Sequence, residues 1–196
     1  MARKTDKKKE KRMPIPVLIG AGITEQWYFT HLKTLRRFKV QIRPRFFGNE
    51  HIHTLEKNVE MVLATEGRAI VVFDTDVTQW DEGERNRLEV FRRKFAKDSR
   101  VILCESMPSI EYWFLLHYAA TNRHFGTSKA VIAELNKFVA QFDKTERFLS
   151  NPKWVWDMLA EGRLEAAMQR AEAFAHNGES YTDVWMVIKV LMADMA

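Results

Sequence analysis

The feature that most constrains the fold is an unbroken apolar run, residues 69–73, which ends in Asp74-Thr75-Asp76. A strand with one solvated face alternates apolar and polar side chains, whereas a continuous apolar run suits a strand that is buried on both faces of a parallel sheet. The run therefore predicts a central strand in a sheet that is covered on both sides.

The chain around this run alternates short β-branched segments with longer amphipathic segments, which is typical of α/β domains. Strands are predicted at residues 15–20, 40–47, 69–73 and 100–104. Helices are predicted from Thr24, as an N-cap, to residue 35, and at 54–64, 82–96, 108–118, 127–142, 151–159, 162–176 and 180–194. No strand is predicted after residue 127. We expect a flexible basic tail (1–13), an α/β core (14–125) and a helical extension packed on that core (126–196).

The length of 196 residues and a hydrophobic content of 46% allow a sizeable core without disulfides or structural metals. Cys104 is the single cysteine, which excludes a disulfide framework and a zinc ribbon. No segment approaches the roughly 18 apolar residues of a membrane span, and no secretion signal follows the basic start. These features predict a cytoplasmic protein that does not insert into membranes.

The formal charge of +5 is located in the N-terminal tail. Residues 1–12 contain seven of the 31 basic residues and two of the 26 acidic residues, which leaves 24 of each for the rest of the chain. A basic arm of this kind either contacts phosphates or serves as a solubilising leader. The folded part of the chain is therefore neutral overall.

A local basic patch interrupts this balance, because no acidic residue lies between Glu25 and Glu50. Its basic residues are Lys33, Arg36, Arg37, Lys39, Arg43 and Arg45. The patch is the candidate contact for nucleic-acid phosphates.

Acidic side chains follow the predicted strands where ligands collect in open parallel sheets, beyond the carboxyl ends of the strands. Asp74 and Asp76 come directly after the buried run, and two carboxylates at this spacing can point to a common centre. Mg²⁺ is commonly held by one or two carboxylates together with waters and phosphate oxygens. The alternative is that the two aspartates form Asx-turns or cap the next helix.

Two glutamates adjoin the same predicted edge. Glu25 lies in the first turn of a helix that follows a glycine turn, where it either stabilises the helix start or joins the site. Glu111 lies in a strongly apolar helix and needs a partner, so it is either half of a structural salt bridge or a site carboxylate. The chain contains no GxxxxGK[ST] motif and is not itself a P-loop ATPase.

Three motifs in this order resemble the RloB family. Residues 20–25 (Gly-Ala-Gly-Ile-Thr-Glu) resemble its C-E-G-x-x-T-E turn, and an aromatic-bearing helix with Trp27-Tyr28-Phe29 follows. Residues 71–76 resemble its strand ending in D-x-D, and residues 106–118 resemble its S-N-P-x-F-E-x-W-L-L-L-H-F element. The resemblance extends over roughly residues 14–194.

The resemblance implies a Toprim-like (Rossmann-like) parallel sheet core with a C-terminal helical extension. It also implies a metal site for Mg²⁺ (or Mn²⁺) at Asp74, Asp76 and Glu25, with Glu111 completing a catalytic acidic cluster. Proteins of this family are linked to phage defence and restriction loci, which implies nucleic acid and an AAA- or ABC-type ATPase as partners.

One position departs from the family pattern, because the glutamate that follows the first strand of catalytic Toprim domains is Ala21 here. An alanine can neither bind a metal nor accept a proton. Three functions therefore stay open: a Mg²⁺-dependent nuclease-type subunit, a catalytically degenerate binding or regulatory module, and a nucleotide-binding sensor.

Overall fold

A computed structural model of the chain describes residues 13–43, 51–76, 81–174, 176 and 180–195. It contains a five-stranded sheet in the order β2-β1-β3-β4-β5. The strands are β1 (Pro16–Gly20), β2 (Gln41–Arg43), β3 (Arg68–Asp74), β4 (Val101–Met107) and β5 (Tyr181–Thr182). The first four strands are parallel and β5 pairs antiparallel with β4. The predicted α/β class is thus confirmed, with a Rossmann-like core.

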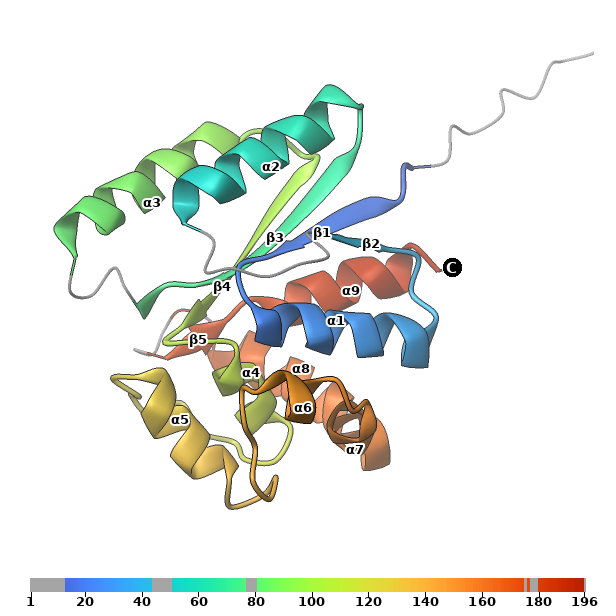
Figure 1. Cartoon of the computed structure of the whole chain (residues 1–196), viewed down its shortest axis with the longest axis vertical. Coiled ribbons are helices and arrows are strands. Elements are labelled where there is room, and N and C mark those ends of the chain that lie inside the picture. Colours follow the sequence, from blue (N-terminus) through green and yellow to red (C-terminus); the bar gives the residue numbers. More distant parts are fainter. Residues whose placement is uncertain (1–12, 44–50, 77–80, 175, 177–179, 196) are drawn as a thin grey trace, which may run out of the picture.

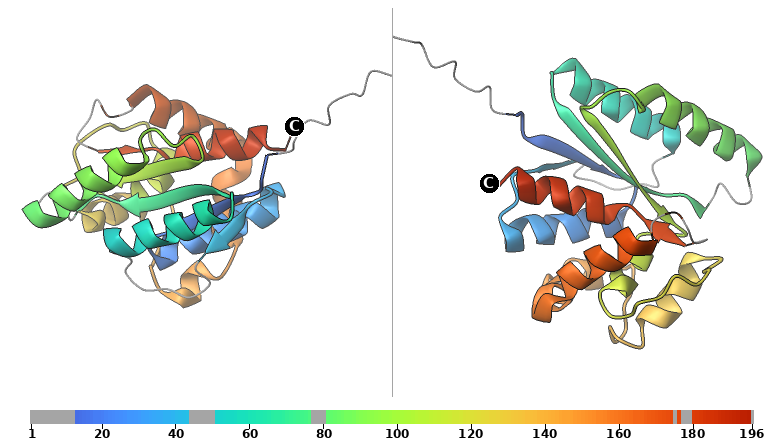
Figure 2. Two further views of the ribbon diagram at one scale, coloured as in Figure 1. Left: turned by 90° about the horizontal axis from the view of Figure 1, so that it is seen from above. Right: turned by 180° about the vertical axis from the view of Figure 1, so that it is seen from behind.

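Helices cover both faces of this sheet, and α2 and α3 lie on the face opposite α1 and α9 (Figure 1). The helices of the core are α1 (Ile23–Arg36), α2 (Ile52–Ala64) and α3 (Glu82–Phe95). The later helices are α4 (Glu111–Leu116), α5 (Ser128–Leu135), α6 (Glu146–Leu149), α7 (Lys153–Leu159), α8 (Arg163–Phe174) and α9 (Val184–Ala193), with a 3-10 turn at Ala160–Gly162. Helices α4 to α8 form a further layer beyond α1 and α9 (Figures 1 and 2).

The buried run forms β3, whose alternate side chains enter two separate hydrophobic clusters. Ile70 and Val72 pack in a cluster that includes side chains of α1, α4, α8 and α9, whereas Val71 and Phe73 pack with α2 and α3. This two-sided burial explains why the run contains no polar position.

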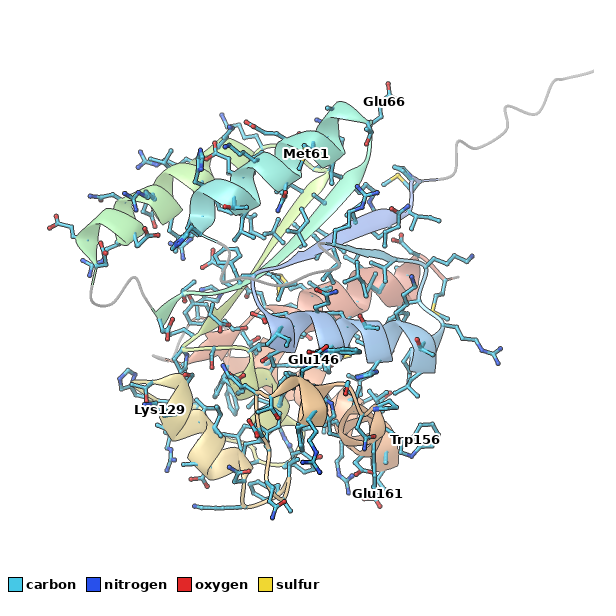
Figure 3. All side chains as sticks on the ribbon, in the orientation of Figure 1. Met61, Glu66, Lys129, Glu146, Trp156 and Glu161 are labelled. Carbon is cyan, nitrogen blue, oxygen red and sulfur yellow. The ribbon has the colours of Figure 1, made fainter. Side chains whose placement is uncertain are left out.

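Met61 on α2 and Trp156 on α7 are large exposed hydrophobic side chains that lie on opposite sides of the molecule (Figure 3).

The prediction missed one strand and placed the start of two helices wrongly. β5 follows residue 127, where no strand was predicted, because two residues are too short to give an alternating pattern. The cap of α1 is Gly22, and Thr24 lies inside the first turn. Helix α4 begins three residues after Pro108, and its N-cap Ile110 donates its backbone N–H to Asp74. Residues 1–12 and 44–47, which contain the basic tail and the end of the predicted second strand, lie outside the described residues.

None of the helices in the described parts of the chain is long and apolar enough to cross a membrane.

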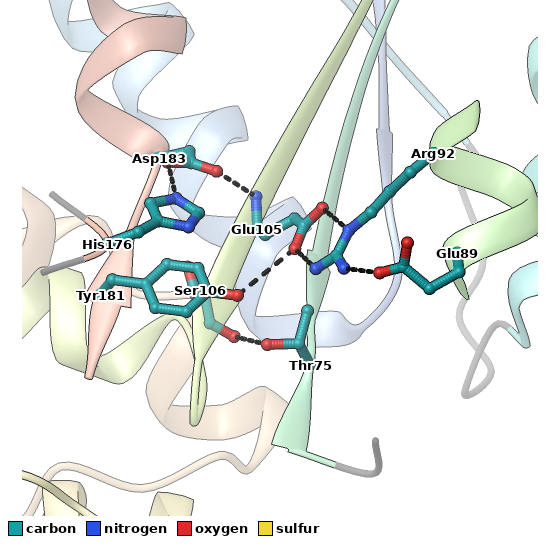
Figure 4. A network of polar contacts seen from close by, with 8 residues as sticks. All are labelled: Thr75, Glu89, Arg92, Glu105, Ser106, His176, Tyr181 and Asp183. Carbon is teal, nitrogen blue, oxygen red and sulfur yellow. Dashed lines mark hydrogen bonds and ion pairs between the residues drawn. The ribbon is translucent and has the colours of Figure 1, made fainter. Parts of the chain in front are cut away.

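A polar network ties α3 and β5 to the end of β4 (Figure 4). The guanidinium of Arg92 on α3 donates two hydrogen bonds to the Glu105 carboxylate on β4, one of 2.7 Å from Nε to Oε1. The hydroxyl of Tyr181 on β5 reaches the same carboxylate at 3.4 Å. The Glu105 side chain is only 7% exposed, so its charge depends on these donors. The network therefore joins three elements through one buried carboxylate.

Replacing Arg92 with leucine should destabilise the protein, because Glu105 would remain buried without its charged partner. Breaking a buried pair costs about 3–5 kcal/mol, and partial exposure of Arg92 reduces our expectation to about 2 kcal/mol. Urea unfolding measures this change. The exposed Arg93 on the same helix is the matched control, and a loss in Arg92→Leu no larger than in Arg93→Leu would contradict this role of the network.

Candidate functional site

The connections from β1 and β3 leave the sheet in opposite directions, which makes the gap between these strands the switch point of the sheet. Helix α1 returns the chain from β1 to β2 at one edge, whereas α3 leads from β3 to β4 on the other side. Open α/β sheets bind ligands at the carboxyl ends of the strands at such a point. A cleft of about 600 Å³ lies here and is lined by Glu25, Asp74 and Asp76. The structure thus brings together the three residues predicted as metal ligands.

Glu25 reaches this cleft from the first turn of α1 and is only 4% exposed. The preceding turn leaves room for its carboxylate, because a Cβ atom at Gly22 would lie 2.9 Å from Oε2 of Glu25. Burial raises the pKa of Glu25 to about 7, and repulsion from Glu111 acts in the same direction. A hydrogen bond from its own backbone and the charge of Lys144 partly oppose this rise. A cation that enters the cleft would therefore favour the ionised form of Glu25.

Asp74 ends β3 and is held in place by one hydrogen bond, because its Oδ1 accepts the backbone N–H of Ile110 at 2.8 Å. Burial raises the pKa of Asp74 well above its usual range, and repulsion from Glu25, Glu111 and Asp76 raises it further. The carboxylates at the switch point are therefore close enough to disfavour each other's ionisation.

Glu111 is fully buried and has two partners. The hydroxyl of Ser109 donates to its Oε2 at 2.5 Å, and Nζ of Lys144 lies 2.9 Å from its Oε1. The salt-bridge interpretation of Glu111 thus holds in geometry. Its charge also repels those of Glu25 and Asp74, but Glu111 is not among the residues that line the cleft, so its role as a site carboxylate stays a prediction. Burial acts to lower the pKa of Lys144, but attraction to Glu111, Asp74 and Glu25 outweighs it, so this pKa is raised.

The residues fit a hydrated Mg²⁺ better than a fully protein-ligated ion. Within the described residues, no three His, Cys, Asp or Glu side chains are grouped to hold one metal ion. Mg²⁺ usually keeps several waters and needs only one or two carboxylates, which Glu25, Asp74 and Asp76 can supply as hard oxygen donors. The raised pKa values of Glu25 and Asp74 also show that a positive charge would be favourable here. Ala21 lines the cleft as well, so a longer acidic side chain at this position would enter it.

None of the described residues of the basic patch lines this cleft. Lys33 and Arg36 lie in the last turn of α1 and Arg37 is its C-cap. Arg36 follows Glu25 by eleven positions in the same helix, a distance of about 16 Å along the axis. Arg43 ends β2 at the carboxyl edge of the sheet, and Arg45 lies outside the described residues. A phosphate chain would have to extend along α1 to contact both regions.

A second hollow of about 830 Å³ lies in the helical layer and is lined by Tyr118, Phe138 and Arg163 among others. It contains none of the predicted acidic residues. We therefore place the candidate site at the smaller cleft, where the titratable groups converge.

Comparison with known families gives one match, in which a family model described as RloB-like protein covers residues 17–191. The chain belongs to the RloB-like family. No curated protein and no solved structure matches it. The RloB-like region begins in β1 and ends in α9, so it includes the acidic cluster and the helical layer that supplies Lys144.

Four titratable residues that line this RloB-like cleft were not predicted as site residues, namely His51, Asp81, Glu84 and Lys144. Lys144 lies in an irregular segment between α5 and α6, and no local pattern relates that segment to β1 or β3. His51 is the N-cap of α2 and also lines the cleft, whereas the sequence His51-Ile52-His53, without further ligands in pattern, favours a surface loop over a metal site. Only the tertiary packing of the helical layer reveals the contribution of Lys144.

The raised pKa of Glu25 predicts a pH dependence of stability. The ordinary value is 4.5 and the folded value about 7, so the folded protein binds more protons between these limits. The free energy of unfolding of the protein therefore falls as the pH rises through this window. The stabilisation that comes from the raised pKa of Glu25 is fully present only below the ordinary pKa. Glu25→Gln should reduce this fall by about 1–3 kcal/mol, with Asp74 maintaining part of the slope.

Urea unfolding between about pH 5 and about pH 8 in EDTA measures this slope. The control is Glu165→Gln on the exposed surface of α8, which should keep the slope of the wild-type protein. An identical slope in Glu25→Gln and the wild-type protein would show that Glu25 titrates in the same way in both states.

Proposed function

We propose that this RloB-like protein is a Toprim-like, Mg²⁺-dependent nucleic-acid-processing subunit of the nuclease type. We further propose that it acts in a prokaryotic phage-defence system with a partner AAA- or ABC-type ATPase. The observation that carries the proposal is the convergence of Glu25, Asp74 and Asp76 on one cleft at the switch point between β1 and β3. Membership of the RloB-like family supports the same conclusion.

In this proposal one or two of the carboxylates of Asp74, Asp76 and Glu25 would bind a cation that keeps several of its waters. When bound, Mg²⁺ or Mn²⁺ supplies Lewis-acid polarisation of a phosphate oxygen and lowers the pKa of a bound water. The chain itself orients the carboxylates, because the N–H of Ile110 fixes Asp74 and Ser109 fixes Glu111. These contacts keep the acidic groups in place when a substrate enters.

The charge of the cleft supports the need for a cation. Asp81 and Glu84 line it together with the three proposed ligands. Arg87 pairs with Glu84, and Lys144 is the one lysine or arginine among the described residues that line the cleft. A nucleic-acid phosphate would be repelled by such a surface unless a divalent cation neutralised it. Phosphates farther along the nucleic-acid strand would contact residues of the basic patch, namely Lys33, Arg36, Arg37, Arg43 and Arg45.

A second candidate function is a catalytically degenerate binding or regulatory module of the same system. The observation that favours it is Ala21, which occupies the turn after β1 and lines the cleft without an oxygen ligand. In this case the acidic cluster would bind metal weakly and would not cleave the substrate.

A nuclease assay on single- and double-stranded DNA and RNA separates the two functions. Under the nuclease proposal the isolated wild-type protein should cleave slowly in the presence of Mg²⁺ or Mn²⁺, because Ala21 supplies no oxygen ligand. Asp74→Asn should reduce this rate at least about 100-fold because it removes a charged ligand. Asparagine is chosen because its side-chain oxygen can still accept the N–H of Ile110. Ala21→Glu should increase activity by restoring a hard oxygen donor.

The matched control is Asp98→Asn, which changes a partly exposed aspartate that lies outside the cleft, before β4. Inactivity of the wild-type protein and of Ala21→Glu, even with the partner ATPase, would refute the nuclease proposal. Robust cleavage that depends on Asp74 would instead refute the degenerate module.

A further inference from the structure

Lys144 places an ammonium group among the acidic side chains at the switch point. Its Nζ lies 2.9 Å from Oε1 of Glu111, and its charge also attracts Asp74 and Glu25. The side chain lines the same cleft as Glu25, Asp74 and Asp76. A positive group thus already lies at the cleft of the proposed metal ligands, in an ion pair with the neighbouring Glu111.

The backbone on both sides of Lys144 is held by specific contacts. Phe142 is buried against Phe114 and Trp154, and its N–H donates to Oδ1 of Asn136 at 2.7 Å. Thr145 caps α6, and its N–H donates to Asp143 at 2.9 Å. These contacts fix the point from which the lysine side chain extends. Its position at the acidic cluster is therefore set by the helical layer.

The side chain itself is less constrained than its backbone. It is 41% exposed, whereas the Glu111 side chain that it contacts is fully buried. A lysine has four flexible methylene groups and can move its ammonium group toward water without a change in the backbone. Lys144 can therefore leave the cluster when another cation replaces its charge.

We propose that Lys144 is an intrinsic cation of the acidic cluster, which a divalent metal ion must displace from Glu111 and its neighbours. This inference rests on the metal-binding part of the proposed function and concerns the regulation of that same site. The Lys144 ammonium and a metal ion in the same cleft would repel each other. Lys144 therefore weakens metal binding as long as its ammonium group stays beside Glu111. It also stabilises the metal-free protein, because it compensates the buried charge of Glu111.

The simpler alternative is that Lys144 is only a structural partner of Glu111. Both interpretations predict that Lys144→Met destabilises the metal-free protein. Only the proposed competition predicts that the same change strengthens metal binding. Metal affinity, measured separately from stability and from cleavage, therefore distinguishes them.

The test is isothermal titration calorimetry of the full chain with MgCl₂ and with MnCl₂ after removal of metals by EDTA. Lys144→Met should bind Mg²⁺ at least about ten-fold more tightly than the wild-type protein, because one repelling charge is lost. Lys144→Arg keeps the charge and should stay within about two-fold of the wild-type affinity. The control Lys137→Met removes a surface lysine that pairs with Glu134 and should not change the affinity.

Thermal unfolding with EDTA or Mg²⁺ provides a second measurement on the same four proteins. Mg²⁺ should raise the melting temperature of Lys144→Met more than that of the wild-type protein. Equal or weaker Mg²⁺ binding by Lys144→Met, or no binding by either protein, would overturn the inference. Tighter binding by Lys144→Met would support it even if every variant failed to cleave nucleic acid, so the failure of the nuclease proposal can be recognised separately.

Discussion

The central constraint in this structure is the burial of several carboxylates at one point of the sheet. Glu25, Asp74 and Glu111 come from three different elements and repel each other across the end of β1 and β3. Such a cluster is unfavourable unless protons, an ammonium group or a metal ion compensate the charge. In this structure the raised pKa values of Glu25 and Asp74 favour their protonated forms, and Lys144 provides an ammonium group beside Glu111.

The topology explains why this unfavourable cluster exists. The order β2-β1-β3-β4-β5 places the turn after β1 beside the end of β3, and the N–H of Ile110 brings the start of α4 to Asp74. The helical layer then contributes Lys144, from the segment between α5 and α6, to the lining of the cleft. A fold without a ligand at this position would gain stability from apolar residues here, which supports a functional origin of the acidic groups.

The sequence predicted the part of the site that depends on strand order and missed the part that depends on long-range packing. The apolar run before Asp74 and the glycine turn before Glu25 identified two strand ends, and parallel strands bring such ends to one edge. The sequence around β5 does not indicate a strand, because two residues are too few to show an alternating pattern. The sequence around Lys144 does not indicate its contact with the cleft, because the irregular segment between α5 and α6 has no pattern that relates it to a particular strand. The basic residues were grouped by sequence, whereas α1 carries Arg36 away from Glu25.

The most direct test of a cation site at the switch point is a crystal structure of the protein soaked in Mn²⁺, with the metal located by anomalous scattering. We expect a peak within about 2.5 Å of a carboxylate oxygen of Asp74, Asp76 or Glu25, with waters completing the coordination. We also expect the Lys144 ammonium to move away from Glu111 in the same crystal. A Mn²⁺ peak elsewhere, with Glu25 and Asp74 unchanged and Lys144 still on Glu111, would contradict the account.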